Sequence, residues 1–184
     1  MAKNAQQHSS RKPLDQREDA VKRIPVEIVP YERAYRDAFK RLNIEWLEKD
    51  FCVEEIDERV LSDPEAYILS NGGFVFFARA GAHIVGTAAL IKADNNRYEL
   101  SKMSVTDAYQ GLGIGRQLAE AAIRQFEEMG ARELYLESNS RLKPAISLYE
   151  SLGFVHRPAR ADSEYKRADV YMLYRPRQST PIST

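Results

Sequence analysis

The sequence has very little cysteine and no long apolar run. These absences argue against disulfides, metal sites and membrane spans. The single cysteine, Cys52, excludes an internal disulfide, and we expect its thiol to be packed rather than nucleophilic. No cysteine and histidine cluster has the spacing of metal ligands, so we expect no metal. No apolar stretch approaches the roughly 20 residues of a membrane span. Residues 1–23 are polar and lack the apolar core of a signal peptide. We therefore expect a cytoplasmic protein without a membrane partner.

The sequence also lacks an excess of charge of either sign. Lys plus Arg and Asp plus Glu both number 27. Six basic residues against three acidic ones lie in 1–23 and again in 156–184, so the acids are concentrated between them. A nucleic-acid-binding domain would concentrate basic charge on its folded body, so we expect no nucleic-acid partner. With 184 residues the chain can bury one sizeable core, which we place at 24–175. We expect a polar, disordered tail at 1–23 and a second tail at 176–184.

Apolar periodicity predicts alternating strands and helices. Aromatic and aliphatic residues at helical spacing favour amphipathic helices, and β-rich runs bounded by turn residues favour strands. The expected strands are 24–29, 74–80, 83–93, 98–105, 133–137, 154–156 and 168–174. The expected helices are 31–49, 53–61, one that ends at Met129 and one from Pro144 to Gly153. This order predicts a mixed α/β (α+β) sheet.

Three glycines at alternate positions, Gly111, Gly113 and Gly115, follow the strand that ends at Val105. Glycine allows a sharp turn and leaves backbone N–H groups bare. The helix that follows has apolar residues four positions apart, so one face is buried and its N-terminus is fixed. Bare N–H groups in front of a fixed helix N-terminus bind anions, most often phosphate. The segment therefore predicts a phosphorylated cofactor.

The sequence supports the other interpretations of the glycine segment to different degrees. A P-loop would need Gly-Lys-Ser/Thr, and Arg116-Gln117 follows the last glycine, which disfavours nucleoside triphosphate hydrolysis. A dinucleotide fingerprint would need glycine in place of Arg116, although Glu137 lies at a tolerable distance for its ribose-binding acid. That interpretation is weakened but open. A glycine-rich turn without a ligand also remains open.

The pattern Gln110-x-x-Gly113-x-Gly115 resembles the acetyl-CoA pyrophosphate loop of the GNAT superfamily of N-acetyltransferases, Arg/Gln-x-x-Gly-x-Gly/Ala. The resemblance continues through 134–139 and 144–154 in the same order and spacing. It implies the GNAT fold, a single mixed, mostly antiparallel twisted sheet that is flanked by helices and splayed at the cofactor site. It also implies acetyl-CoA as the acetyl donor and a primary amine of a small molecule or peptide as the acceptor. It leaves a homodimer open.

Two residues are the catalytic candidates. Acetyl transfer to an amine needs a base, because a protonated amine has no lone pair. Glu99, six residues before Val105, matches the position of the glutamate base in some GNAT members; the alternative is a solvent-facing glutamate on an amphipathic strand. Tyr149 matches the family's tyrosine that donates to the CoA sulfur; the alternative is a packed aromatic residue.

The resemblance also implies cofactor contacts. The strand backbone at Met103 and Val105 is expected to pair with an extended pantetheine. Arg116 either contacts a phosphate or points to solvent, and Asn139 either contacts the pantetheine or its neighbouring water or serves as a turn residue. The full expected set is Met103, Ser104, Val105, Gln110, Gly111, Leu112, Gly113, Ile114, Gly115, Arg116 and Asn139.

Between positions 45 and 65 lie nine acidic residues and two basic ones. In the GNAT fold this region forms one wall of the acceptor groove, so we expect its charge, including Glu54, to attract a cationic amine. Trp46 and Phe51 are expected to pack against that amine. The alternative is that these acids are solvated helix faces and that Trp46 lies in the core. A non-catalytic acyl-CoA-binding module on the same fold would need neither Glu99 nor Tyr149.

Overall fold

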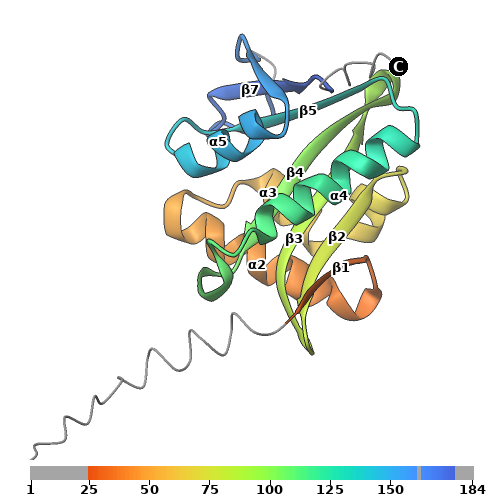
Figure 1. The fold of residues 1–184 in the computed structure, drawn as a ribbon, viewed down its shortest axis with the longest axis vertical. Helices are drawn as coiled ribbons and strands as arrows, with labels where there is room; N and C mark the ends of the chain where they lie inside the picture. Colours follow the sequence, from red (N-terminus) through yellow and green to blue (C-terminus); the bar gives the residue numbers. More distant parts are fainter. Residues whose placement is uncertain (1–24, 161–162, 177–184) are drawn as a thin grey trace, which may run out of the picture.

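The computed structural model describes residues 25–160 and 163–176, which form a layered α/β structure (Figure 1). The strands are β1 (Val26–Pro30), β2 (Phe74–Ala80), β3 (His83–Ala93), β4 (Arg97–Val105), β5 (Glu133–Ser138), β6 (Phe154–Arg157) and β7 (Val170–Tyr174). The helices are α2 (Arg36–Asp50), α3 (Glu55–Ser62), α4 (Ile114–Glu128) and α5 (Lys143–Ser151). Shorter helical turns are η1 (Arg33–Tyr35), η2 (Glu65–Leu69), η3 (Asp94–Asn96) and η4 (Asp107–Tyr109).

The strands form one sheet in the order β1-β2-β3-β4-β5-β7-β6. Neighbouring strands are antiparallel except β4 and β5, which run parallel. The β4–β5 pairing joins only 97–99 to 133–135. Beyond these residues the two strands separate, so the sheet opens near its middle. The predicted mixed, mostly antiparallel sheet with flanking helices is confirmed.

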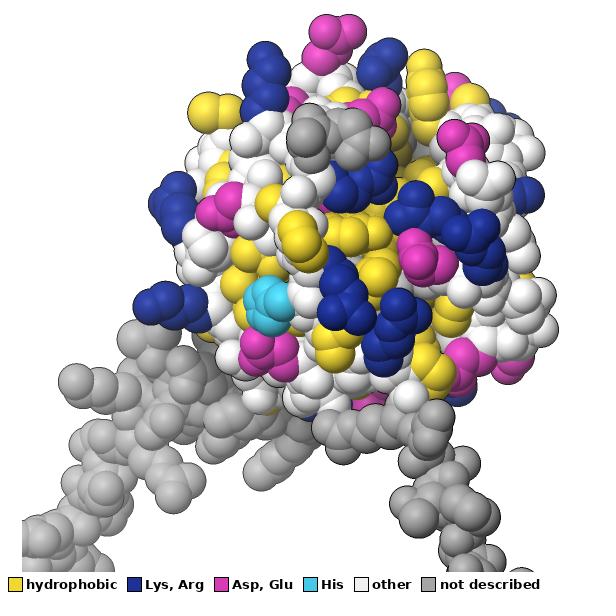
Figure 2. Space-filling view, turned by 90° about the horizontal axis from the view of Figure 1, so that it is seen from above, with side chains coloured by type: hydrophobic (Ala, Val, Ile, Leu, Met, Phe, Trp, Pro, Cys, Tyr) yellow, Lys and Arg dark blue, Asp and Glu magenta, His cyan; other side chains and the backbone are white. Residues whose placement is uncertain are grey.

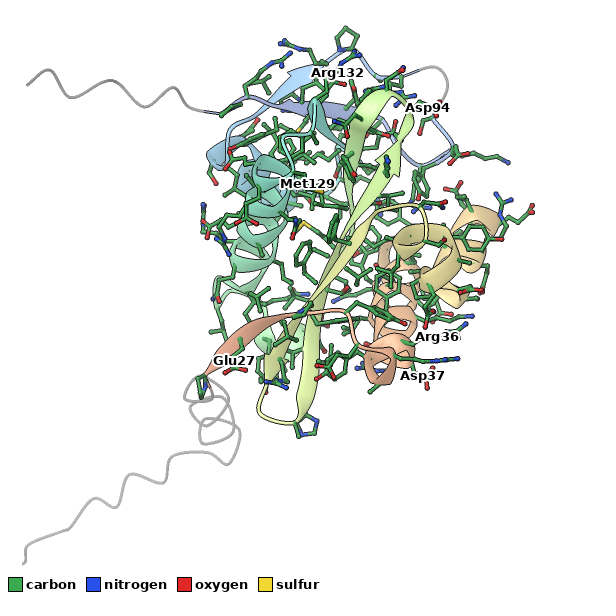
Figure 3. The ribbon with its side chains drawn as sticks, turned by 90° about the vertical axis from the view of Figure 1, so that its right-hand side faces the viewer. Glu27, Arg36, Asp37, Asp94, Met129 and Arg132 are labelled. Carbon is green, nitrogen blue, oxygen red and sulfur yellow. The ribbon has the colours of Figure 1, made fainter. Side chains whose placement is uncertain are left out.

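Helices cover both faces of the sheet. In Figure 1, helix α4 lies across the front face of the sheet, and α2 and α3 lie on its back face. Figure 3 shows the two sides edge-on, with Met129 at the end of α4 on one side and Arg36 and Asp37 at the start of α2 on the other. The buried side chains of α4 recur at helical spacing: Ile114, Leu118, Ala119, Ala121, Ala122, Ile123 and Phe126. Burying each large apolar side chain contributes about 1.5–3 kcal/mol, which fixes α4 on the sheet.

A bulge in β4 changes which face its side chains meet. Lys102 and Met103 together lie opposite one β3 residue, Ala88, and Lys102 has a φ of 52°. Before the bulge Leu100 packs in the core beneath α4, whereas after it Met103 and Val105 pack against that core. Strand side chains otherwise alternate strictly between faces. The bulge therefore turns Lys102 toward α2 and α3.

Several expectations need correction or lie outside the structure. The turn η2 is π-helical and was not expected, because Pro64 was interpreted as the end of the preceding helix. Cys52 is exposed rather than packed, because it lies in the connection between α2 and α3. Residues 1–23, and residues 177–184 of the predicted C-terminal tail, lie outside the described residues. Within the described part of the chain, no helix has both the length and the apolar character needed to cross a membrane.

Candidate active site

A cavity of about 140 Å³ lies where β4 and β5 separate. Its walls come from α2, α3, β4, β5, α5 and the segment before β7. Both catalytic candidates, Glu99 of β4 and Tyr149 of α5, line this cavity. Met103, Asn139 and Trp46 line it as well. The fold thus collects residues predicted for base, acid, cofactor and acceptor roles around one space.

Glu99 is the last β4 residue that pairs with β5, where it lies opposite Tyr135. Its side chain is partly buried at the cavity wall, so the solvent-facing alternative does not apply. Burial raises the pKa of Glu99 to about 7; the nearby charge of Glu137 adds to the rise and that of Lys102 opposes it. A carboxyl group with this pKa is partly ionised at neutral pH, so its carboxylate form can accept a proton there. This is what a general base requires.

Tyr149 presents its hydroxyl group to β4. The hydroxyl lies 3.7 Å from Sδ of Met103, and the ring packs edge-on against Phe154 at 6.0 Å between centroids. Burial raises the pKa of Tyr149 to about 12, so the hydroxyl keeps its proton at neutral pH. Tyr149 is therefore both a packed aromatic residue and an available proton donor.

The glycine segment forms an open turn between β4 and α4. Gly111 and Gly113 have φ of 75° and 77°, in the left-handed region that favours glycine. Gly113 is the N-cap of α4 and no side chain caps this end. The N–H of Gln117 bonds to the Gly113 carbonyl oxygen, so the N–H groups of 114–116 have no helical acceptor. A Cβ added at either glycine would meet nothing within 4 Å. Open space at these two glycines, next to N–H groups without a helical acceptor, suits an anion such as phosphate.

Several side chains in the expected cofactor set are held by the protein itself. The amide of Gln110 donates to the Val105 carbonyl oxygen at 3.0 Å. The hydroxyl of Ser104 donates to the Leu42 carbonyl oxygen at 2.9 Å and so points toward α2. The side chain of Ile114 is buried in the core. Ser104 and Ile114 therefore have only backbone groups to offer a cofactor.

The structure favours the second interpretation of Asn139. Its amide donates to the Arg167 carbonyl oxygen at 2.6 Å, and its Oδ1 accepts from the N–H of Arg141 at 3.0 Å, which is the pattern of a turn asparagine. Arg116 donates to the hydroxyl of Ser151 at 2.7 Å. Its guanidinium therefore lies against the end of α5 rather than free in solvent.

Of the residues predicted to face the acceptor, Trp46 lines the cavity and Glu54 does not. Trp46 lines the cavity and packs on Phe51 at 5.5 Å between centroids. Glu54 is absent from the cavity wall: its carboxylate lies 2.9 Å from the Arg167 guanidinium and accepts from the N–H of Lys166 at 3.0 Å. The expectation that Glu54 faces the acceptor is not supported, because this carboxylate caps α3 and forms an ion pair.

The cavity wall also holds a cluster of polar residues to which the sequence interpretation gave no individual role: Asp57, Lys102, Tyr165 and Arg167. Asp57 is fully buried and lies 2.7 Å from both the Lys102 ammonium and the Arg167 guanidinium. The available signal was an acid at the start of a helical i, i+3, i+4 pattern with Val60 and Leu61, both buried. An acid on the buried face of a helix requires a buried partner, which the sequence does not identify.

Charges outside the cavity are mixed and partly paired. Seen from above, basic and acidic side chains lie interspersed around an apolar area (Figure 2). On β4, Arg97 pairs with Glu133 at 2.6 Å and its guanidinium lies 4.8 Å from the centre of the Tyr135 ring. Among the described residues, no group of three or more His, Cys, Asp or Glu could hold a metal ion.

Two similar sequences differ in how much of the chain they cover. The uncharacterized N-acetyltransferase YjgM of Escherichia coli K12 is 44% identical over 71 residues, which cover 39% of this chain and 42% of that protein. The chain therefore aligns with less than half of this relative's length. N-alpha-acetyltransferase 30 of Schizosaccharomyces pombe is 27% identical over 159 residues, or 80% of this chain and 91% of that protein.

Solved structures share the fold. An acetyltransferase of the GNAT family from Staphylococcus aureus Mu50 superposes with a TM-score of 0.74 at 24% identity, covering 82% of this chain and 98% of that one. The PaiA N-acetyltransferase of Thermoplasma acidophilum, solved in complex with coenzyme A, gives 0.66 at 18% identity, covering 83% and 100%. A family model described as "Acetyltransferase (GNAT) family" matches residues 35–154, more than half of the chain. The chain therefore belongs to the GNAT acetyltransferase family.

Proposed function

We propose that the protein is an N-acetyltransferase that transfers the acetyl group of acetyl-CoA to a primary amine of a small molecule or peptide. The observation that carries this proposal is the position of Glu99 and Tyr149 on one cavity, at the splay of β4 and β5. The open glycine turn directly follows the same β4. A base, an acid and an anion site on connected, rigid elements can hold two substrates in reacting geometry.

The residues present fit acetyl-CoA. The free N–H groups at 114–116 suit the pyrophosphate, and the β4 edge at 103–105 has no β5 partner and can pair with the pantetheine. A second cavity includes Val105 and Gln110 and adjoins the first at Trp46. The neighbour from Thermoplasma acidophilum was solved with coenzyme A, and YncA of Salmonella typhimurium, with a TM-score of 0.64, was solved with acetyl-CoA. Acetyl-CoA supplies an acetyl group activated as a thioester.

Glu99 and Tyr149 each carry out one proton transfer. Glu99 accepts a proton from the ammonium form of the acceptor, which frees the nitrogen lone pair. The nitrogen then forms the C–N bond as the C–S bond of the thioester breaks. Tyr149, which keeps its proton at neutral pH, donates it to the departing sulfur. The first proton of the acceptor ammonium passes from Glu99 to solvent. The second proton, which the nitrogen loses as the amide forms, restores the Tyr149 hydroxyl through solvent, so the reaction releases one proton overall.

The acceptor is a primary amine whose remaining part meets aromatic and apolar surface. Trp46, Phe51 and Leu142 line the cavity, while its negative charge near the base comes from Glu99 and Glu137. The relative from Schizosaccharomyces pombe is named an N-alpha-acetyltransferase, which favours the α-amino group of a peptide among the candidate amines.

A thiol-release assay with acetyl-CoA and a panel of amines tests the proposal. The panel contains peptides with free α-amino groups, the same peptides blocked at that group but carrying lysine, free amino acids and polyamines. We expect amine-dependent thiol release, which Glu99→Gln reduces while acetyl-CoA still raises the melting temperature. A non-catalytic module would show the melting shift without thiol release for every amine. Absence of the melting shift would contradict the cofactor assignment.

A further inference from the structure

Lys102 occupies the β4 bulge in a backbone conformation that glycine favours. Its φ of 52° lies in the left-handed region. A residue other than glycine stays in this region only where its surroundings over-determine it. The bulge also turns the side chain toward α2 and α3, where it is 4% exposed. Specific contacts of this buried ammonium group must therefore hold the bulge.

An ion network holds the Lys102 ammonium group. Nζ donates to Oδ1 of Asp57 at 2.7 Å and to the hydroxyl of Tyr165 at 3.0 Å. The Arg167 guanidinium binds the same Asp57 carboxylate at 2.7 and 3.0 Å. Burial opposes the charge on Asp57, but the bonds from Arg167 and Lys102 outweigh it and hold the Asp57 pKa below its usual range. The carboxylate stays ionised and holds the ammonium in place. Burial lowers the pKa of Lys102 below its usual range, and the charge of Asp57 and its hydrogen bond oppose this fall.

The Lys102 ammonium acts on Glu99, three residues earlier on the same strand. The charged and titratable groups that interact with Glu99 are Lys102 of β4, Tyr135 and Glu137 of β5, and Glu164 and Tyr165 of the segment before β7. Burial, Glu137 and Glu164 all oppose ionisation of Glu99, and Lys102 is the cation that favours it. Asp57 binds the Lys102 ammonium and is itself bound by Arg167, so both residues position the charge of Lys102.

We propose that Lys102 is a positioning residue for acetyl transfer: its ammonium group, fixed by Asp57 and Tyr165, holds the β4 bulge and places a positive charge on the cavity wall that also carries Glu99. This inference rests on the proposed role of Glu99 as the base. It assigns to the buried ion network a function beyond joining α3 to the segment before β7.

Titration of the Glu99 carboxyl carbon by NMR, in protein labelled with ¹³C-glutamate, tests the proposal without requiring turnover. The signal is assigned by its loss in Glu99→Gln. We expect a midpoint near 7 in the wild type and in Lys102→Arg, which keeps the charge. In Lys102→Met, which keeps the length but not the charge, we expect a midpoint about one pH unit higher. If Lys102→Met does not fold, Lys102→Gly replaces it, because glycine adopts the required φ without strain.

The activity profile gives a second readout. A midpoint raised by one unit reduces the ionised fraction of Glu99 at pH 7 about fivefold, so kcat/KM at that pH falls by the same factor and recovers at higher pH. Lys40→Met, which removes an exposed ammonium paired with Glu58, leaves the profile unchanged.

Equal Glu99 midpoints in the charge-free and arginine variants would overturn the proposal and leave Lys102 a purely structural residue. If the wild type transferred no acetyl group, the proposed function would fail, yet the NMR comparison would still decide the role of Lys102.

Discussion

At the scale of single residues, the environment of Glu99 predicts the pH dependence of the reaction. Its pKa of about 7 means that the reactive carboxylate form is lost as pH falls through neutrality. We expect kcat/KM of the wild type to rise with pH through an inflection near 7. Glu99→Gln should lose on the order of a hundredfold in rate near neutral pH and recover partly at high pH, where the amine is already free. Identical pH–rate profiles for variant and wild type would show that Glu99 is structural.

The same residue predicts a pH dependence of stability. Because the folded-state pKa of Glu99 is raised from 4.5 to about 7, the folded state binds more protons than the unfolded state between these values. The free energy of unfolding therefore decreases as pH rises through this window. Glu99→Gln removes this loss, so its melting temperature relative to wild type should be higher above pH 7 than near pH 4.5. A constant difference in melting temperature across the window would contradict the raised pKa.

Tyr149 should act through its hydroxyl group alone. Tyr149→Phe keeps the ring packed on Phe154 and removes the proton donor. We expect a lower kcat with an unchanged acetyl-CoA-dependent melting shift. Because the pKa of Tyr149 is about 12, the wild-type rate should not fall from loss of this proton anywhere near neutral pH. Wild-type turnover in Tyr149→Phe would leave Tyr149 as a packing residue only.

At the scale of elements, the two ends of α4 give a matched test of the cofactor site. Gly113 and Gly130 have φ of 77° and 61°, and an added Cβ would meet nothing within 4 Å at either one. Valine at either position therefore brings a similar backbone strain of about 1–2 kcal/mol. We expect Gly113→Val to abolish the melting shift caused by acetyl-CoA and Gly130→Val to retain it. An equal shift in both variants would contradict the phosphate position.

At the scale of the whole molecule, the ion network ties α3 to a segment far away in sequence. Arg167 bonds to Asp57 and Glu54, more than a hundred positions earlier. Removing one partner of a buried pair leaves charge uncompensated, so Arg167→Met should lower the free energy of unfolding by about 3 kcal/mol. Arg41→Met, which removes an exposed i, i+4 pair with Glu45, should cost under about 1 kcal/mol. Chemical denaturation of both variants measures the difference, and equal losses would show that the network contributes little.

Much of the fold could be predicted because it depends on local patterns. The apolar spacing that predicted α4 is the spacing that buries Leu118 and Phe126. Of the three glycines that predicted a turn, Gly111 and Gly113 adopt the left-handed φ that glycine favours, whereas Gly115 lies in the first turn of α4. Both depend on residues within a few positions of one another. The π-helical turn at 65–69 lies against β2 and β3, and no local pattern indicated it.

What the sequence alone determined is therefore the order of elements and the glycine turn. The roles of Glu99 and Tyr149 in proton transfer stay predictions. What only the tertiary structure decided is which charges reach the cavity. Alternation along β4 gives no sign of the bulge that turns Lys102 toward Asp57. Neighbouring acids do not show that Asp57 is buried while Glu54 binds Arg167. Such pairings join distant positions, and the energy that selects them comes from desolvation and ion pairing in the assembled fold.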